Sequence, residues 1–392
     1  MSNLSTTDKL RVGVIGAGFI AERGHLPGYQ CHPQTEVVAI CDPNEERAHK
    51  VAQEYGIRHV FADHRRMLET EHLDLVSVCT PNALHAPATI AALEAGAHVL
   101  CEKPMALTVA EAKTMIETAE RVGRKLTVGF HNRFRPECQI LKNLAEQGTL
   151  GEIYYARVSM LRRSGIPGYG SWFTNKKLAG GGSLMDSGVH GLDLVLWLME
   201  QPRPVSVLGV TFREFGSRGQ GLGGWGADIY GGLQQFDVDD LAVAMIRFEN
   251  GAVLMLEISW AGHSISCEWL QLLGKDGGAE LDLDPSEGGT CLRVFTSLHD
   301  QPVDIIPEVP KIALDSQFLA SHPALSAFPN MKFLGAHQKK IEDTVDSIVH
   351  NRAPLVTPQQ ALLVTQLLES IYKSAETGRE IRFKEGASYA ET

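Results

Sequence analysis

A turn at residues 16–21, directly after an apolar run at 10–15, most constrains what this chain can fold into. It has glycine at positions 16 and 18 and alanine at 21. In such a Gly-x-Gly-x-x-Gly/Ala turn the first glycine turns the chain, the second lets a pyrophosphate approach the backbone, and the small third residue permits close packing. A helix opening there presents free amides and a positive dipole end to phosphate. Glycine pairs also occur in ordinary tight turns. The secondary structure predicted around the turn therefore has to distinguish a dinucleotide-binding turn from an ordinary one.

The sequence around the turn is an alternation of β-branched runs and amphipathic helical stretches. The runs lie at 10–15, 36–41, 74–79, 98–101 and 126–129, and the helix candidates at 44–55, 85–95 and 108–122. The alternation predicts a parallel sheet with helices on both faces, and the nearly continuous apolar runs are typical of doubly covered strands. Ligands of such sheets bind beyond the carboxyl ends of the strands, so the residues after each strand are the candidate cofactor residues.

The strand at 36–41 is followed by a carboxylate, Asp42. At this position a carboxylate can accept hydrogen bonds from the ribose hydroxyls of NAD, and its charge repels the extra phosphate of NADP. The alternative is that Asp42 is the N-cap of a helix beginning near Pro43, which is compatible with the first role. We therefore expect NAD rather than NADP.

Two further strand ends carry polar side chains. Thr80 and Asn82 can hydrogen-bond a cofactor, or they can merely shape a turn and cap the helix that begins near His85. After the run at 98–101, Pro104 biases Lys103 away from helical geometry. A lysine held at such a strand end indicates a functional role more than a solvated surface residue.

Together these motifs resemble the Gfo/Idh/MocA family of glucose-fructose oxidoreductases, inositol dehydrogenases and rhizopine-catabolism proteins. The segments that carry the resemblance are 16–21, 41–43, 80–82, 102–104, 129–134, 180–193, 351–357 and 371–375. The resemblance implies an α/β fold: a Rossmann doubly wound domain over 1–130, and over 131–392 an α+β domain with an open, mostly antiparallel sheet. It also implies that the second domain binds substrate and forms oligomer contacts, giving a homodimer or homotetramer.

The second part of the sequence agrees with an antiparallel sheet. Strand-like alternation appears at 152–163, 204–213, 239–248, 251–260, 266–273, 278–283 and 290–296, and helical periodicity at 184–199 and 358–377. A turn at 249–251 contains Asn-Gly, which is typical of an antiparallel hairpin.

Asp186 and His190 are four residues apart at the start of a predicted helix, which places them on one face, one turn apart. Oxidation of an alcohol requires removal of its proton while hydride leaves, and imidazole suits that task near neutral pH. The resemblance implies that Lys103, Asp186 and His190 line the substrate site. Our hypothesis is that His190 transfers the proton, Lys103 stabilises alkoxide character and Asp186 orients substrate or histidine. Whether Lys103 or His190 is the formal base stays open, and the plain alternative for His190 is a helix histidine packed on a sheet.

The remaining candidates complete the predicted site. The cofactor candidates are Gly16, Gly18, Phe19, Ile20, Asp42, Thr80, Pro81, Asn82, His85, Glu102, Lys103 and Arg133. The substrate candidates are His131, Tyr169, Trp172 and His337, and no metal ligand set is predicted. Where many relatives have Trp-Arg, this chain has Trp172-Phe173, which removes a guanidinium and leaves the charge of the substrate undetermined.

Composition excludes several other classes. Asp and Glu number 47 against 36 Lys and Arg, with no basic run, so a nucleic-acid partner is not expected. The seven cysteines are scattered without a Cys-x-x-Cys pair, which indicates neither a disulfide framework nor a zinc site. No stretch approaches the roughly 18 to 20 apolar residues of a membrane helix, and the first residues do not resemble a signal peptide. We therefore expect a cytoplasmic protein with no membrane partner.

The sequence thus predicts an NAD-dependent oxidoreductase that moves a hydride between nicotinamide and a secondary alcohol of a sugar, a cyclitol or a glycoside. One alternative keeps the fold but uses transient oxidation of a sugar carbon to enable elimination or glycosidic cleavage. Another is a sensor that binds sugar and dinucleotide without catalysis. Retention of Lys103, Asp186 and His190 together argues against the sensor, because a sensor needs no proton transfer.

Overall fold

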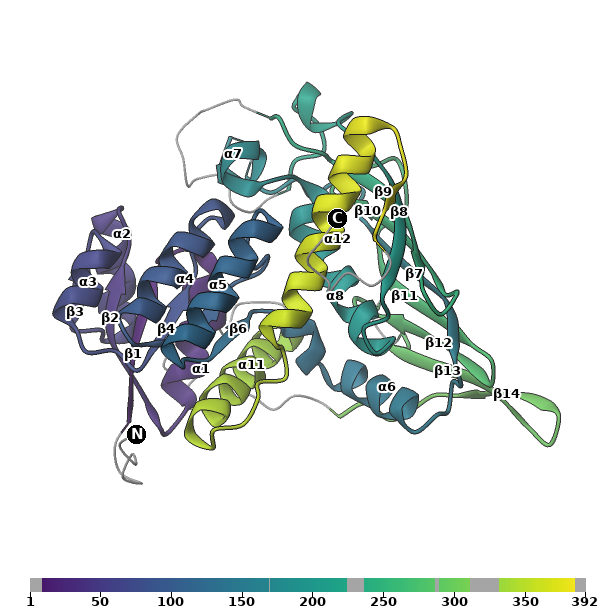
Figure 1. The fold of residues 1–392 in the computed structure, drawn as a ribbon, viewed down its shortest axis with the longest axis horizontal. Helices are drawn as coiled ribbons and strands as arrows, with labels where there is room; N and C mark the ends of the chain where they lie inside the picture. The colour runs from purple at the N-terminus through teal and green to yellow at the C-terminus, as the bar shows by residue number, and fades with distance from the viewer. Residues whose placement is uncertain (1–8, 169, 224–235, 286–288, 311–330, 385–392) are drawn as a thin grey trace. The chain divides into compact units, whose positions relative to one another are not determined.

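Two sheets, each with its own helices, organise the chain (Figure 1). The computed structural model describes residues 9–168, 170–223, 236–285, 289–310 and 331–384. The first compact unit comprises Met1–Ala106, Ala110–Arg135 and Lys311–Ala361, and the second comprises Leu107–Val109, Pro136–Pro310 and Leu362–Thr392. Among the described residues, no helix is long and apolar enough to cross a membrane.

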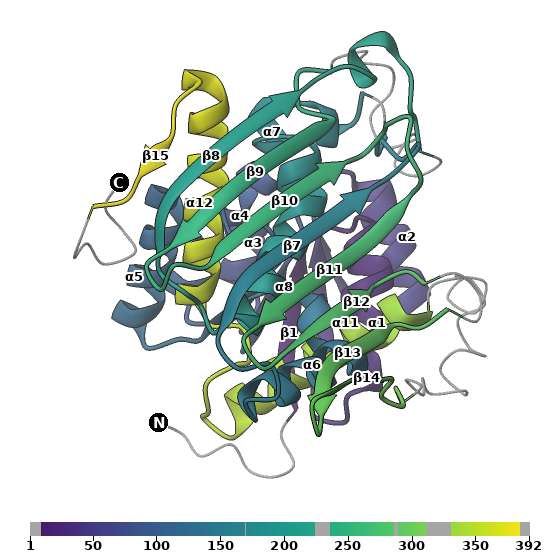
Figure 2. The same ribbon diagram turned by 90° about the vertical axis from the view of Figure 1, so that its right-hand side faces the viewer.

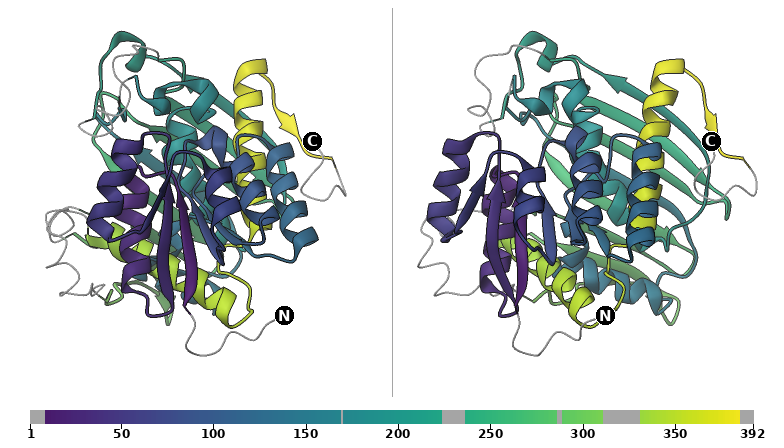
Figure 3. Two further views of the ribbon diagram at one scale, coloured as in Figure 1. Left: turned by 90° about the vertical axis from the view of Figure 1, so that its left-hand side faces the viewer. Right: turned by 60° about the vertical axis from the view of Figure 1, so that its left-hand side comes forward.

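The sheet of the first unit has six parallel strands in the order β3-β2-β1-β4-β5-β6 (Figure 3). They are β1 (Leu10–Ile15), β2 (Thr35–Cys41), β3 (His59–Phe61), β4 (Leu75–Val78), β5 (His98–Cys101) and β6 (Leu126–Val128). The predicted parallel sheet is confirmed, with the strand order of a dinucleotide-binding fold. Strand β3 was not predicted, because three residues are too few to show the alternation of a strand.

Helices cover both faces of this sheet. They are α1 (Leu26–Cys31), α2 (Glu45–Tyr55), α3 (His64–Thr70), α4 (His85–Glu94), α5 (Val109–Val122) and α11 (Met331–Val349). On one face, Ile341 and Val345 of α11 pack in a core with Leu10 and Val12 of β1. A Cβ on Gly28 of α1 would lie 2.7 Å from Ile341, so the two helices approach closely. On the opposite face, Gly13 faces side chains that include Met67 of α3.

The first unit is therefore discontinuous in sequence. Helix α11 packs on the first sheet, although the sequence-based division at residue 130 placed it with the second domain. Its apolar positions recur at helical spacing, and such a stripe does not specify which sheet it packs against. The N-cap of α2 also differs from the alternative considered for Asp42: the side chain of Asn44 caps this helix, by accepting a hydrogen bond from the Arg47 amide.

The sheet of the second unit is mostly antiparallel, as predicted, in the order β14-β13-β12-β11-β7-β10-β9-β8-β15 (Figure 2). Its strands are β7 (Ile153–Leu161), β8 (Pro204–Phe212), β9 (Leu241–Phe248), β10 (Val253–Ser259), β11 (Cys267–Gly274), β12 (Gly277–Asp282), β13 (Leu292–Leu298), β14 (Gln301–Ile305) and β15 (Ile381–Arg382). Only the β7–β10 pair among these described strands is parallel. The outer strands β14 and β15 were not predicted.

Helices pack against one face of the second sheet. A Cβ on Gly191 of α8 (Val189–Leu198) would lie 2.5 Å from Val158 of β7, and one on Gly209 of β8 would lie 2.7 Å from Ile371 of α12 (Pro358–Thr377). No helix of the described residues covers the opposite face, which is toward the viewer in Figure 2. Its exposed apolar side chains include Leu208, Val210, Phe212 and Met245.

Candidate active site

The glycine turn has the two properties that its sequence predicted. Gly16 has φ +98°, and a Cβ there would lie 2.5 Å from the carbonyl oxygen of Cys79, so the chain can turn at this point only with glycine. A Cβ on Gly18 would instead meet nothing within 4 Å. Its backbone is therefore open to a ligand. The following helix begins with a π-turn, Ala21–His25, before α1, and Phe19 and Ile20 lie just ahead of it.

Asp42 is buried at the end of β2 and ties the glycine turn to the next helix. Its Oδ2 accepts a hydrogen bond from the Ala17 amide at 2.9 Å, and its Oδ1 accepts from the Asn44 amide at 2.8 Å. The Arg47 guanidinium also donates to Oδ1, at 2.7 Å. The carboxylate thus lies beside the turn, as predicted, and a cation that the sequence analysis did not weigh lies next to it.

After β4 lie two polar side chains with different roles. The Thr80 hydroxyl is available to a ligand, and the His85 ring connects this turn to the turn after β5. The hydroxyl of Thr80 is buried and has no hydrogen-bond partner in the described part of the chain. The ring of His85 lies 2.6 Å from the Pro104 carbonyl oxygen and 3.0 Å from that of Thr80. Burial lowers the pKa of His85, so the neutral ring donates to one carbonyl. Asn82, which follows Pro81, is buried in a short 3₁₀ turn, Asn82–Leu84.

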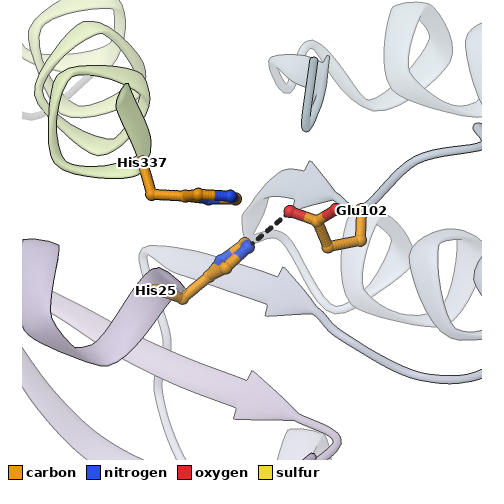
Figure 4. Close-up of side chains that lie close together, drawn as sticks. All are labelled: His25, Glu102 and His337. Atoms are coloured by element: carbon orange, nitrogen blue, oxygen red, sulfur yellow. Dashed lines mark hydrogen bonds and ion pairs between the residues drawn. The ribbon is translucent and has the colours of Figure 1, made fainter. Parts of the chain in front are cut away.

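Glu102, at the end of β5, is the centre of a buried polar cluster (Figure 4). Its Oε1 lies 2.8 Å from His25 Nε2 and 2.7 Å from Lys340 Nζ, while its Oε2 accepts a hydrogen bond from the Lys103 amide at 3.1 Å. Burial disfavours the charged carboxylate, but the Lys340 ammonium and the His25 contact outweigh it and hold the pKa of Glu102 well below its usual range. The carboxylate is therefore ionised.

His25 extends this cluster into the core of the first unit. Its Nδ1 lies 3.0 Å from Ser77 Oγ, which lies 2.6 Å from the Tyr29 hydroxyl. Burial, and then the Lys340 ammonium, lower the pKa of His25 to about 4, so the ring is neutral. One direction of donation satisfies this chain: Tyr29 to Ser77, Ser77 to Nδ1, and Nε2 to Glu102. That direction requires the Nε2-protonated tautomer. The Lys340 Nζ, 3.0 Å from the same Nε2, is then a close contact and not a hydrogen bond, because both atoms are donors.

His337 of α11 lies beside the cluster. It is 1 % exposed, and neither ring nitrogen has a hydrogen-bond partner among the described residues. Burial and the Lys340 ammonium lower its pKa well below the usual range. Its ring stacks on His131, with centroids 4.4 Å apart, and lies against Phe333. Two predicted substrate residues, His131 and His337, are thus brought together.

Neither His25 nor Lys340 was predicted as a site residue. His25 lies in the π-turn after the glycine motif, and Lys340 lies in α11, a helix that was not predicted. The available signal was the recurrence of apolar residues at Leu334, Ile341 and Val345, which is helical spacing.

Arg133 has partners different from those expected of a cofactor residue. It is fully buried, and its guanidinium donates to the Gln360 side chain at 2.7 Å and to the Leu355 carbonyl at 3.4 Å. Through these contacts Arg133 fixes the segment that follows α11 and contains Leu355 and Gln360. A role in cofactor binding stays a prediction.

In the second unit, a buried carboxylate fixes the glycine-rich turn that precedes Asp186. Asp239 accepts hydrogen bonds from the amides of Gly182 and Leu184, the Ser183 hydroxyl and the Tyr372 hydroxyl, at 2.7 to 3.0 Å. Burial and the neighbouring Asp239 raise the pKa of Tyr372 well above its usual range, so its hydroxyl stays protonated. A Cβ on Gly182 would lie 1.8 Å from the Asp239 carbonyl oxygen, which excludes any other residue.

Asp186 and His190 lie on consecutive turns of one helical segment. Asp186 belongs to a π-turn, Leu184–Gly188, and His190 to α8, so the helix predicted over 184–199 is present and its first turn is a π-turn. Such turns are frequent at functional sites. Both side chains are half-buried. The fully buried Trp260 donates from Nε1 to Asp186 Oδ2 at 3.0 Å, and this partner was not predicted.

Two other substrate candidates, Trp172 and Tyr169, belong to the part of the chain between β7 and α8. Trp172 is half-buried in a 3₁₀ turn, Trp172–Thr174, and its ring stacks on Phe173 with centroids 3.8 Å apart. Tyr169 lies outside the described residues. Trp172 therefore contacts the residue that replaces the arginine expected from the resemblance.

The residues of each unit suit a different task. In the first unit, the open backbone at Gly18, the carboxylate of Asp42 and the Thr80 hydroxyl fit a dinucleotide, and Lys103 lies on the adjacent turn. In the second unit, a carboxylate and an imidazole one turn apart can orient a hydroxyl and transfer its proton.

Two family models match the chain. The first, described as an oxidoreductase family with an NAD-binding Rossmann fold, matches residues 10–130. The second, described as a GFO/IDH/MocA C-terminal domain, matches residues 138–280. The first match spans all six strands of the first sheet, and the second spans strands β7 to β11 and most of β12 of the second sheet.

Individual relatives align over nearly the whole chain. A D-glucoside 3-dehydrogenase of Escherichia coli is 33% identical over 97% of this chain and 99% of the relative. A myo-inositol 2-dehydrogenase of Thermotoga maritima is 28% identical over 96% of this chain and 99% of the relative. The solved structure of a levoglucosan dehydrogenase with NADH and L-sorbose superposes with a TM-score of 0.78 at 25% identity, over 96% of this chain and 99% of that one.

Proposed function

We propose that this chain, an oxidoreductase that belongs to the Gfo/Idh/MocA family, moves a hydride between NAD and a secondary alcohol of a sugar, a cyclitol or a glycoside. The observation that carries the proposal is the Asp186–His190 pair, on a turn that Asp239 and Trp260 hold in place. A pair of this kind serves proton transfer, which simple binding of a sugar does not require.

The chemistry divides among three side chains. The bound nicotinamide supplies the hydride acceptor or donor. His190 accepts the hydroxyl proton during oxidation and returns it during reduction. The ammonium of Lys103 stabilises negative charge on the reacting oxygen, and Asp186, fixed by Trp260, orients a neighbouring hydroxyl or the imidazole.

The preference for NAD over NADP follows from Asp42. Its buried carboxylate lies beside the glycine turn, where it suits two ribose hydroxyls and repels a phosphate. Arg47 reduces that repulsion, because it donates to the same carboxylate. We expect a higher kcat/KM with NAD than with NADP, and Asp42→Ala should move the ratio toward NADP. An unchanged ratio in Asp42→Ala would show that Asp42 does not select the cofactor.

Glycosides of glucose are the first substrates to test. One relative, 33% identical over 97% of this chain, is named a D-glucoside 3-dehydrogenase. We also propose that the protein is a homo-oligomer. The face of the second sheet that faces away from its helices exposes apolar side chains on neighbouring strands, for example Leu208 on β8 and Met245 on β9.

The test is a screen of glycosides, aldoses, inositols and linear polyols with NAD and NADP, following the absorbance of reduced nicotinamide. Lys103→Ala and His190→Ala should each lower kcat/KM by about 100-fold or more. Lys50→Ala and His299→Asn replace an exposed lysine and an exposed histidine and serve as matched controls. Unchanged turnover in both site variants would remove the mechanism. Cofactor binding without turnover on any substrate would favour a sensor.

A further inference from the structure

Lys340 places an ammonium in the interior of the first unit, at a position that resembles a metal site. His25, Glu102 and His337 offer two imidazoles and one carboxylate whose ligand atoms all lie within 4.8 Å of one another (Figure 4). Lys340 Nζ lies 2.7 Å from Glu102 Oε1 and 3.0 Å from His25 Nε2. The ammonium therefore contacts two of the three atoms that a metal ion would need.

The charges in the cluster explain why a cation is present there. Glu102 is buried and ionised, and an isolated carboxylate in such a place would be strongly unfavourable. His25 and His337 are neutral, so neither balances it. Among the described side chains that contact Glu102 Oε1, Lys340 supplies the positive charge, as a metal ion would in a metalloprotein.

Glu102 links this cation to the catalytic turn. Its Oε1 is held by Lys340, and its Oε2 accepts the hydrogen bond of the Lys103 amide. The carboxylate has little room to move, because a Cβ on Gly129 would already lie 2.5 Å from Oε1. A shift of the carboxylate would therefore be transmitted to the backbone of Lys103.

We propose that Lys340 is a resident cation in place of a metal ion, and that through Glu102 it is a positioning residue for Lys103. The inference rests on the proposed catalytic role of Lys103. Removal of the ammonium leaves a buried carboxylate without a counter-charge, which must move or take up a proton, and either change alters the support of the Lys103 turn. Small displacements of a catalytic group are costly, about 100-fold for roughly 1 Å.

The experiment compares Lys340→Met with Lys339→Met in the full-length enzyme. Lys339 is the neighbouring residue of the same helix, and its side chain is 56% exposed. Rates are expressed per NADH-binding site, counted by fluorescence titration, so that loss of folded protein does not count as loss of kcat. Lys340→Met should lower kcat by roughly 10- to 100-fold, with KM for NAD changed by less than about threefold, and Lys339→Met should leave both within about twofold.

A double variant keeps the test valid if Lys340→Met does not fold. Glu102→Gln with Lys340→Met removes both charges, so no unpaired charge is buried. Its kcat should equal that of Glu102→Gln alone, because the ammonium acts only through the carboxylate. Wild-type kcat in the double variant would overturn the proposal.

Two other outcomes would also overturn it. Wild-type kcat in Lys340→Met, with turnover abolished in Lys103→Ala, would remove the positioning role and leave the proposed function intact. Stoichiometric zinc or manganese in the purified enzyme, with activity lost to a chelator and restored by that metal, would make the cluster a metal site. Full turnover in Lys103→Ala would instead contradict the proposed function itself.

Discussion

Glu102 in the first unit and Asp239 in the second are both buried carboxylates, but their partners differ in charge. Glu102 pairs with the ammonium of Lys340, whereas Asp239 accepts hydrogen bonds from backbone amides and two hydroxyls, all of them neutral. Each lies against a glycine where a side chain would collide, Gly129 and Gly182. Each also holds the turn that carries a proposed catalytic residue.

The difference in partners separates two ways of fixing a reactive group. A buried ion pair is expensive to desolvate, and removal of one partner leaves the other without compensation. A carboxylate that accepts several neutral donors loses its bonds one at a time, at about 1.5–3 kcal/mol for each bond to a charged group. The first arrangement should therefore be the more sensitive to substitution and to pH.

The largest effect is expected from Glu102→Ala. This change leaves the Lys340 ammonium buried without its counter-charge, and the free energy of unfolding should fall by about 3–5 kcal/mol. Urea unfolding followed by circular dichroism measures it. Glu36→Ala, which removes an exposed carboxylate paired with Arg58 on the same sheet, should cost less than about 1 kcal/mol. An equal decrease in the free energy of unfolding in the two variants would mean that the buried pair contributes no more to stability than the exposed pair.

The second effect is acid sensitivity of the first unit. The pKa of His25 is lowered from 6.5 to about 4 in the folded chain, so the unfolded chain binds the proton first as pH falls. Stability should therefore decline between pH 6.5 and about 4, by about 3 kcal/mol for this group at 1.36 kcal/mol per pH unit. His25→Gln should flatten that part of the curve. Hydrogen exchange at pH 5 should show the first unit opening before the second, and the reverse order would contradict the comparison.

In the first unit, the sequence predicted the parts that depend on short-range pattern. The strand before the glycine turn, the open Gly18 and the carboxylate at Asp42 all follow from local spacing and were found in place. Lys339 and Lys340 show where such reasoning ends. They are adjacent and chemically identical, yet one is exposed and the other buried, because successive helix residues point about 100° apart and the sequence does not show which sheet the helix meets.

The third effect tests the neutral arrangement. Asp239→Asn replaces two acceptor oxygens by one, so part of the set of amide and hydroxyl donors loses its partner. The free energy of unfolding should fall by about 2 kcal/mol, and kcat should fall because the turn before Asp186 is less well fixed. Asp284→Asn, at an exposed position of the same unit, is the control. A loss larger than that of Glu102→Ala would reverse the proposed order of the two regions.

The smallest effect is expected from Trp260→Phe, which removes a single neutral donor from Asp186. Phenylalanine fills most of the same volume, so the loss is mainly that of one hydrogen bond to a charged group, and the free energy of unfolding should fall by about 1.5 kcal/mol. That donor fixes a proposed catalytic carboxylate. We therefore expect kcat to fall by about three- to tenfold although the protein remains folded, while KM for NAD stays unchanged. Trp269→Phe, on β11 of the same sheet, should leave kcat unaltered. If both tryptophan variants keep wild-type kcat, Asp186 does not depend on its indole partner, and the second unit holds its reactive group through Asp239 alone.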